Sequence, residues 1–474
     1  MPEPNEDSGS CDPVFQPVLE AWGRYVRQAN EAARQGLAEA GVDIDPAAIR
    51  REWFDALSRQ ADAFLRSPAF LGTLKSQLDA VMSALRDRRQ ADRDPHAERM
   101  SEFEREMNAR IEQIESSLDE IEQKIGAGGQ SRENASRSRA STRQEQPVET
   151  RGTTPHTVVS REGTARLLRY KCNAVRFAEP VLICYALINR PYILDLQAER
   201  SVVRKLCEAG FDVYLIDWGV PTDADRELRL EDYICGLMKN AVDCVQRTAD
   251  SEQINLLGYC MGGTMATMFT ALFPGVVRNL TLMATPIDFA GEEGLLNLWT
   301  RPEYFDVDKL IDTFGNCPGE FLQYCFQLMK PVQNFGEKFA QLCENLDDDA
   351  FLRNFLAMEQ WTNDSIPVAG ETFREFVKML YQQNRLVRGD MRLGEEAVRL
   401  ETIRCPLLLL VSEQDHLVPP GSTLALERSV QSTDVKAVTI NSGHVGLAVS
   451  SKSHRELWPQ AVQWLAEHST SAAH

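Results

Sequence analysis

Cys260 stands where a serine would be expected in many hydrolase sequences. The stretch LLGYCMGGTMA (256–266) places it in the pattern Gly258-x-Cys260-x-Gly262. An apolar strand that runs through this pattern into a helix has the form of a nucleophile elbow, since glycines permit the sharp turn. The backbone amide of Met261 and the helix dipole favour a thiolate or an oxyanion at that point. Cys260 is therefore a candidate nucleophile, with a second oxyanion amide expected in the loop 186–189.

Asp415 and His444 follow Cys260 in the order, acid then histidine, that the α/β-hydrolase arrangement requires. Asp415 ends the apolar run 406–415, and His444 follows the run 436–440. We predict a catalytic triad in which Cys260 attacks the substrate. His444 would act as general base and acid, and Asp415 would orient the imidazole and stabilise its charged form.

Each of these residues also has an interpretation without chemistry. A Gly-x-Cys-x-Gly string alone is compatible with a tight turn around a structural cysteine, and the acid and histidine in order favour the triad. Adjacent residues at a strand end point apart, so His416 is expected to be a surface imidazole. His454 and His468 are expected to be solvated. The remaining cysteines considered are expected to be free thiols without chemistry: Cys172, Cys184, Cys207, Cys235, Cys244, Cys317, Cys325, Cys343 and Cys405.

The elements that must position these residues are short apolar strands alternating with helices, the pattern of a mostly parallel sheet covered on both faces. The expected strands are 181–188, 212–218, 254–260, 279–285, 406–415 and 436–440. The gap between the fourth and fifth is far longer than an ordinary strand–helix connection. We expect an α/β-hydrolase catalytic domain over 161–474, with a helical cap inserted at about 290–400.

The N-terminal part differs in composition. Residues 1–125 are expected to form a helical, partly coiled-coil region. Amphipathic patterns cover 15–26, 53–64 and 70–85, and an apolar seam at heptad spacing covers 107–125. Ser67-Pro68 resembles a helix N-cap followed by proline at the first helical position. Residues 126–160 are expected to be a flexible linker, because this stretch is rich in small and polar residues.

Bulk properties narrow the function. The 474 residues carry a formal net charge of −19, which argues against binding nucleic acid through its phosphates. The first residues lack the features of a secretory leader, and no apolar run is long enough for a transmembrane segment. Eleven cysteines without a CxxC pair do not resemble a disulfide framework or a zinc site. A cytoplasmic setting is expected, with no metal and no organic cofactor.

A thiol at the elbow favours acyl transfer from a thioester. Exchange of an acyl group between two sulfurs is nearly thermoneutral, whereas a serine ester would be a lower-energy trap. The acceptor, water or an alcohol, decides between a thioesterase and an acyltransferase. A long cap favours the acyltransferase, because it would shield the acyl-enzyme from water.

Several motifs together resemble the catalytic subunit of the polyhydroxyalkanoate synthases, most closely the class III, two-subunit type. They are the stretches 181–221, 254–266 and 355–390, with SEQDHLVPP and SGHVGLAVS, and the resemblance runs from about Leu167 to Leu465. It implies polymerisation of (R)-3-hydroxyacyl-CoA, in particular 3-hydroxybutyryl-CoA, with release of CoA at the surface of storage granules. The family's nucleophile, aspartate and histidine fall on Cys260, Asp415 and His444.

The resemblance also implies that the histidine, aided by the aspartate, activates the 3-hydroxyl group for chain extension. Trp361 matches a characteristic tryptophan of the family, although an ordinary place in the core of the cap explains it equally well. Met261 replaces the family's usual glutamine. The backbone amide survives this change, so we expect it to affect chain preference or rate and not the oxyanion hole.

A class III catalytic subunit begins near this chain's linker and works with a separate helical partner. The N-terminal helices resemble that partner or a granule-associated phasin, so we hypothesise a fused synthase that forms homo-oligomers. A generic dimerisation arm and a need for a separate subunit or phasin stay open. Two other functions also stay open: a cysteine-dependent thioesterase or esterase, and a non-catalytic granule-associated scaffold.

Overall fold

The computed structural model describes residues 46–91, 152–291 and 294–472. The helical pattern expected at 15–26, the heptads at 107–125 and most of the expected linker lie outside these residues. Residues 46–81 belong to the same compact unit as the described residues from 152 onward.

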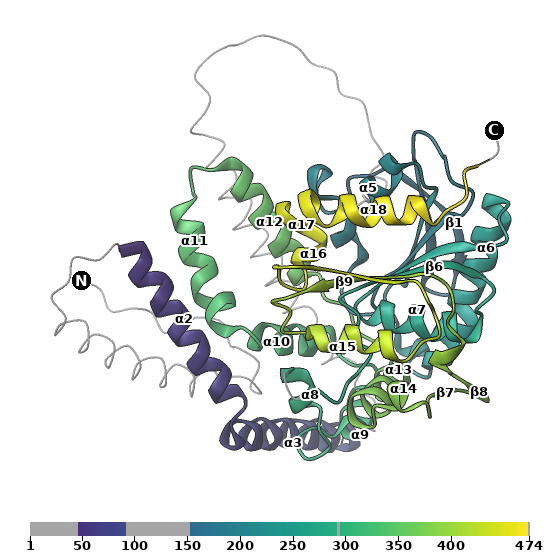
Figure 1. Ribbon diagram of the computed structural model, residues 1–474. Coiled ribbons are helices and arrows are strands. Elements are labelled where there is room, and N and C mark those ends of the chain that lie inside the picture. The colour runs from purple at the N-terminus through teal and green to yellow at the C-terminus, as the bar shows by residue number, and fades with distance from the viewer. Residues whose placement is uncertain (1–45, 92–151, 292–293, 473–474) are drawn as a thin grey trace, which may run out of the picture. The chain divides into compact units, whose positions relative to one another are not determined.

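A central eight-stranded sheet has the order β1-β2-β4-β3-β5-β6-β9-β10 (Figure 1). β2 pairs antiparallel with β1 and β4, and the other neighbours run parallel. The mostly parallel sheet confirms the predicted α/β-hydrolase fold. The strands are β1 (His156–Glu162), β2 (Ala165–Tyr170), β3 (Val181–Cys184), β4 (Val213–Asp217), β5 (Ile254–Tyr259), β6 (Val277–Met283), β9 (Leu407–Ser412) and β10 (Val435–Ile440).

The buried strands follow the apolar runs of the sequence. Every residue of β3, β4, β5 and β9 is buried, because helices cover both faces of the sheet. The hairpin β1–β2 was not predicted. No residue of β1 is fully buried, so this edge strand lacks an apolar run. Its start at His156 moves the end of the expected 126–160 linker to an earlier residue.

Helices cover the two faces of the sheet, α5 and α18 on one side and α6 and α7 on the other (Figure 1). The helices that belong to the catalytic domain outside the insertion between β6 and β9 are η1 (Pro191–Asp195), η2 (Ala198–Arg200), α5 (Val202–Ala209), η3 (Asp223–Asp225), η4 (Asp232–Met238), α6 (Lys239–Ala249), α7 (Met261–Leu272), α15 (Pro420–Leu424), η8 (Ala425–Arg428), α16 (Gly446–Val449), α17 (Ser451–Glu456) and α18 (Trp458–Glu467).

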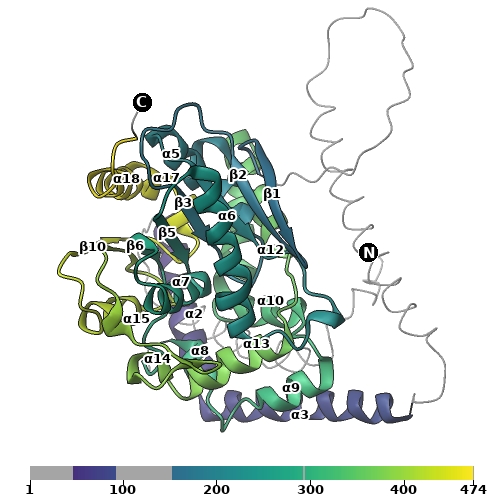
Figure 2. The same cartoon turned by 90° about the vertical axis from the view of Figure 1, so that its right-hand side faces the viewer.

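The chain between β6 and β9 forms a mainly helical insertion. We call this insertion the cap. Figure 2 shows its helices α8, α10 and α13 together beyond one end of the sheet. Its elements are α8 (Leu295–Trp299), α9 (Val307–Phe314), α10 (Gly319–Leu328), η5 (Gln333–Glu337), α11 (Lys338–Glu344), α12 (Asp349–Asn363), α13 (Gly370–Glu375), η6 (Phe376–Gln382), α14 (Arg385–Arg388), the hairpin β7 (Arg392–Leu393) with β8 (Glu396–Ala397), and η7 (Leu400–Thr402).

Two N-terminal helices, α2 (Pro46–Leu65) and α3 (Pro68–Ala91), meet at Ser67. The Ser67 hydroxyl accepts a hydrogen bond of 3.2 Å from the amide of Phe70, as an N-cap does. Both helices contact the cap. Trp299 of α8 donates its indole N–H to the carbonyl of Leu65 over 3.2 Å, and its ring lies 5.9 Å from that of Phe70.

The residues after α18 are fastened to the segment before β3. The amide of Ala178 donates to the Thr470 carbonyl and that of Ala472 to the Arg176 carbonyl, both over 2.8 Å. The Glu179 carboxylate also accepts from the amide and hydroxyl of Thr470. These bonds join residues far apart in the sequence.

The structure corrects several expectations about cysteines and histidines. Cys172 and Cys207 form a disulfide, so they are not free thiols. They lie 35 residues apart in the sequence, and no motif there indicates that they pair. His454 is only 7% exposed, because it packs under α16 and bonds to the carbonyl of Ala448 over 2.7 Å. His468 is half-buried, and its ring stacks on Trp464.

Candidate active site

Cys260 occupies a strained turn between β5 and α7. Its φ of 54° and ψ of −128° lie outside the ordinary regions for a residue with a side chain. The turn is held by the Cys260 amide, which donates to the Met283 carbonyl over 3.0 Å. A Cβ atom on Gly262 would lie 2.3 Å from the Cys184 carbonyl oxygen, and one on Gly258 would lie 2.4 Å from the Gly263 Cα. Both glycines are therefore required by close backbone packing.

The thiol of Cys260 is half-buried and lies at the start of α7, a twelve-residue helix. The first amides of a helix have no acceptor within the helix, and the N-terminal end of its dipole favours negative charge. Met261 is the first residue of α7, so its amide belongs to this group. The elbow thus places Cys260 at the N-terminal end of a helix, and the binding of an oxyanion by the Met261 amide stays a prediction.

His444 and Asp415 form a short contact at the carboxyl ends of the strands. Nδ1 of His444 lies 2.7 Å from Oδ2 of Asp415. The other carboxylate oxygen accepts hydrogen bonds from the amides of Leu417 and Val418, at 2.9 and 2.8 Å. These bonds fix the carboxylate, whose side chain is only 1% exposed. The imidazole has little freedom to rotate.

The charges of the site act on the imidazole in opposite directions. Burial lowers the pKa of His444, but the Asp415 carboxylate and the Cys260 thiolate outweigh burial and raise this pKa to about 10. The influence of Cys260 on this pKa shows that its side chain lies close to the imidazole. At neutral pH the raised pKa favours the imidazolium form of His444. The structure therefore brings the three predicted side chains together.

Tyrosines surround the site, and the sequence analysis did not single them out. The ring of Tyr259 stacks on that of His444 at a centroid distance of 5.2 Å, and its hydroxyl donates to the His444 carbonyl over 3.3 Å. Burial, together with the negative charge of Cys260, raises the pKa values of Tyr185 and Tyr381. These phenols stay neutral at neutral pH. Only Tyr259 had a visible signal, its place in the elbow motif.

The segment after β3, expected to contribute the second oxyanion amide, touches both the elbow and the cap. The carbonyl of Tyr185 accepts from the Trp218 indole over 2.8 Å. The carbonyl of Arg190 accepts from the indole of Trp361 at the end of α12, also over 2.8 Å. Trp361 is 7% exposed, so the core interpretation of this tryptophan holds alongside its hydrogen bond.

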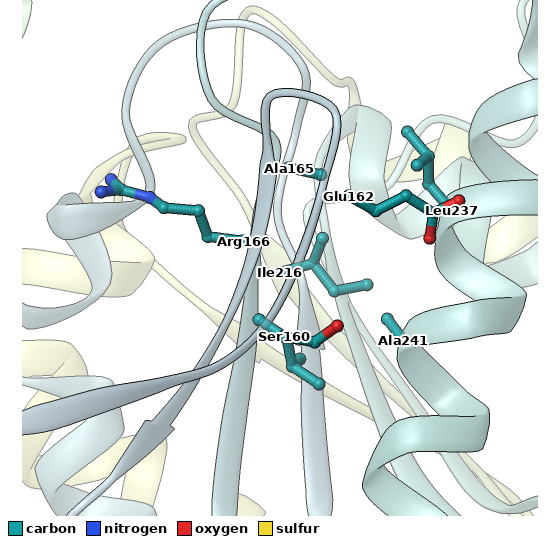
Figure 3. Close-up of a pocket in the computed structure, with 8 residues that line it drawn as sticks. Ser160, Glu162, Ala165, Arg166, Ile216, Leu237 and Ala241 are labelled. Atoms are coloured by element: carbon teal, nitrogen blue, oxygen red, sulfur yellow. The ribbon is translucent and has the colours of Figure 1, made fainter.

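His416 is exposed and lies outside the pair formed by its neighbour Asp415, as expected from its position. A small cavity of about 20 Å³, room for roughly one water, lies elsewhere, between the β1–β2 hairpin and α6 (Figure 3). Among the residues that line it are Ser160, Arg166 and Ala241, and none belongs to the triad.

The described residues contain no group of three or more histidine, cysteine or acidic side chains able to hold a metal ion. Across these same ranges, no helix has the length and apolar character needed to cross a membrane.

The chain matches two protein-family models. One describes the alpha/beta hydrolase fold and covers residues 179–449, and the other describes the poly-beta-hydroxybutyrate polymerase (PhaC) N-terminus and covers residues 130–206.

Three similar proteins each bear the name poly(3-hydroxyalkanoate) polymerase subunit PhaC. That of Haloferax mediterranei is 47% identical over 71% of this chain and 68% of its own length. That of Allochromatium vinosum is 43% identical over 67% of this chain and 89% of its own. That of Synechocystis is 42% identical over 67% and 85%, respectively.

Proposed function

The chain belongs to the poly(3-hydroxyalkanoate) polymerase (PhaC) family, and from this premise we propose that it polymerises (R)-3-hydroxyacyl-CoA through an acyl-Cys260 intermediate. It is an acyltransferase that makes polyhydroxyalkanoate. The proposal adds the substrate, in particular 3-hydroxybutyryl-CoA, and the roles of the site residues. The observation that carries these roles is the 2.7 Å contact between His444 and Asp415, with Cys260 close enough to contribute to the raised pKa of His444.

In the acylation step, the Cys260 thiolate attacks the carbonyl carbon of the hydroxyacyl thioester. The carbonyl π electrons move to oxygen, and the resulting oxyanion is bound by the Met261 amide and an amide of the loop 186–189. Collapse of this intermediate breaks the bond to the sulfur of CoA. The departing thiolate takes the proton from Nε2 of the imidazolium of His444, so CoA leaves as a thiol and the histidine becomes neutral.

In the extension step, a 3-hydroxyl group attacks the acyl carbon held on Cys260. Neutral His444 accepts the hydroxyl proton at Nε2, and Asp415 stabilises the imidazolium that forms. Collapse of the second oxyanion forms the ester bond and expels the Cys260 thiolate. This step restores the imidazolium of His444 and the thiolate of Cys260, so the cycle consumes no reactant other than the thioester and the hydroxyl group.

Incubation of the purified protein with (R)-3-hydroxybutyryl-CoA tests the substrate and the nucleophile together. Release of CoA is followed with a thiol reagent, and the product is sized. We expect a high-mass polyester from the unmodified chain and none from a Cys260→Ala variant. CoA release with free hydroxy acid as the sole product would instead support the thioesterase alternative, and the absence of any CoA release would leave the scaffold alternative.

We further propose that α2 and α3 steady the cap, which is the part a fused N-terminal region would play in activating the enzyme. Leu57 and Ala61 of α2 pack against Val332 of the cap. Ser58 accepts a hydrogen bond of 2.7 Å from the side chain of Gln333. On α3, Asp79 pairs with Lys309 of α9 over 3.0 Å.

Ala61→Arg tests this second proposal because it places a charge where Ala61 is only 2% exposed against the cap. We expect a longer lag before polymer forms and lower specific activity. Ala63→Arg is the matched control, since Ala63 lies on the exposed side of the same helix. Equal lag and activity in both variants would contradict a role of these helices in activation.

We also propose that the chain forms homo-oligomers and attaches to polymer granules in the cytoplasm. Dynamic light scattering tests the oligomers, and fractionation with granules tests the attachment.

A further inference from the structure

The loop that follows β3 is fastened at its two ends by different parts of the molecule. At its start, the Tyr185 carbonyl is bound by the indole of Trp218, which follows β4. At its end, Asn189 and Arg190 are bound by residues of the cap. The segment between them, 186–189, is the one proposed above to bind the oxyanion.

The cap reaches this loop through one short stretch, Trp361–Ser365. The Trp361 indole N–H donates to the Arg190 carbonyl over 2.8 Å. The Arg190 guanidinium pairs with the Asp364 carboxylate, with Nε 3.3 Å from Oδ1. The Ser365 hydroxyl donates to the side-chain oxygen of Asn189 over 3.3 Å. Three contacts thus hold two adjacent loop residues, and all three are partly shielded from water.

The contacts with the cap fall where the backbone of the loop changes direction. Asn189 has a φ of 65°, in the left-handed region, which asparagine adopts more readily than most residues with a side chain. Its side chain and the neighbouring Arg190 are the groups that the cap binds. The loop also lies directly against the elbow, since a Cβ on Gly262 would be 2.5 Å from the Tyr185 carbonyl carbon. We therefore expect a displacement of Asn189 to move the loop backbone that packs beside Cys260.

We propose that Trp361, Asp364 and Ser365 are positioning residues that set the oxyanion-binding loop, so that Cys260 can be acylated only while the end of α12 is seated on Asn189 and Arg190. This inference rests on the proposed function and assigns a role to a contact between cap and sheet. It predicts that loosening the contact impairs stabilisation of the tetrahedral intermediate and spares the nucleophile. A tryptophan that only fills the core would behave differently.

Trp361→Phe removes the indole N–H and keeps most of the buried ring. Trp458→Phe is the matched control, because Trp458 is a fully buried tryptophan outside the cap whose indole N–H donates to the Leu447 carbonyl. For each variant, kcat and KM for CoA release from 3-hydroxybutyryl-CoA are compared with the rate at which iodoacetamide alkylates Cys260, read by mass spectrometry. Alkylation displaces iodide at a saturated carbon, so it needs the thiolate and no oxyanion hole.

For Trp361→Phe we expect kcat to fall by about 10- to 100-fold, less than the full loss of an oxyanion donor, with KM and the alkylation rate within about twofold. Trp458→Phe should leave kcat and alkylation within about twofold. Equal kcat values for the two variants would overturn the proposal. So would parallel losses of alkylation and acylation, because these would indicate damage to the thiolate or the fold.

Hydrogen exchange gives a readout that does not depend on turnover. The backbone amides of 186–190 should exchange faster in Trp361→Phe than in the unmodified chain or in Trp458→Phe, and unchanged exchange would also overturn the proposal. Should Trp361→Phe fail to fold, Ser365→Ala and Asp364→Asn provide the same comparison with smaller changes. If the unmodified chain releases no CoA, the proposed function fails, and exchange still decides whether Trp361 positions the loop.

Discussion

The elbow and the cap, which face each other across the active site, are held in different ways. Every residue of β5 is buried, and all of α7 up to Ala271 is buried as well. In α12 of the cap, Trp361 is the one buried residue. Large apolar side chains of the cap are exposed, including Phe339 at 48% and Leu346 at 56%. The elbow is thus fixed by close packing on both sides, whereas α12 of the cap is held mainly through its one buried residue and a few specific contacts.

This difference separates two kinds of control over one reaction. Closely packed interiors respond to small changes with large losses, because there is no space for relaxation. We expect α12, which is mostly exposed or half-buried, to tolerate change over most of its surface and to be sensitive where it contacts the loop. Changes at the elbow should therefore abolish the chemistry or the fold, and most changes in the cap should adjust rates.

The largest effect is expected from Cys260→Ala. Loss of the nucleophile should reduce CoA release by at least about 1,000-fold, since residual catalysis would come from binding and the oxyanion hole alone. Cys325→Ala, at a half-buried free thiol of α10, is the matched control and should keep activity within about twofold. Thiol release assays on both variants measure this difference. Polymer made by Cys260→Ala would show that Cys260 is not the nucleophile.

Asp415→Asn should have the next largest effect, because it removes the charge that stabilises the imidazolium. We expect a fall in kcat/KM of about 100- to 10,000-fold and a pKa of His444 below its value of about 10. The pKa is measured by NMR titration of the imidazole. Asp434→Asn is the control, since Asp434 contacts His468 Nε2 at 2.9 Å, away from the site.

The same variant has a consequence for stability against pH. Because the folded pKa of His444 is raised from 6.5 to about 10, its pairing adds stability in full below pH 6.5. This contribution is lost as the pH rises through about 10. Urea unfolding of the unmodified chain should therefore show a loss of stability over that window. A curve for Asp415→Asn with the same decline would contradict this source of stability.

Gly262→Ala tests how tightly the elbow is packed. Its Cβ would approach the Cys184 carbonyl oxygen to 2.3 Å, so the backbone would have to move. We expect the free energy of unfolding to fall by about 1–3 kcal/mol. Gly275→Ala should change it by less than about 0.5 kcal/mol, because a Cβ there meets nothing within 4 Å. Urea unfolding measures both, and a similar loss in the two variants would mean that the elbow has room to relax.

The smallest effect is expected inside the cap, at Arg374. This side chain pairs with Asp308, Asp312 and Glu371, and it is 19% exposed. Arg374→Gln should lower the free energy of unfolding by about 1 kcal/mol and leave kcat within about twofold. Arg399→Gln, at a more exposed arginine near Glu401, should have no measurable effect. A loss of turnover in Arg374→Gln as large as in Asp415→Asn would break the contrast between cap and elbow.

The buried part of the fold could be predicted from the sequence because its strands are continuous apolar runs. β9, LLLLVS, is an example, and its long separation from β6 indicated the insertion between them. β1 could not be found in this way, since it is an edge strand with no fully buried side chain. The disulfide between Cys172 and Cys207 was also missed, because it depends on how β2 and α5 approach each other.

The candidate triad could be proposed from residue order alone, since strand ends fix where Asp415 and His444 must lie. Their roles and that of Cys260 stay predictions until the variants are assayed. The partner of Trp361 could not be deduced, because no periodicity or spacing relates an indole to a backbone carbonyl 171 residues away. Stacking of Tyr259 on His444 likewise depends on the approach of two distant segments.

The attachment of residues 468–472 matters for protein engineering. The carbonyl of His468 accepts from the side chain of Asn279 over 3.0 Å, and Thr470 is bound by Glu179. Asn279 belongs to the sheet strand that neighbours β5, so this tail is part of the scaffold behind the elbow. A domain fused for display on polyester beads should therefore be joined beyond Ala472 through a spacer. A fusion junction placed within α18 would remove the hydrogen bonds of residues 468–472 and so loosen the scaffold that carries the fused domain.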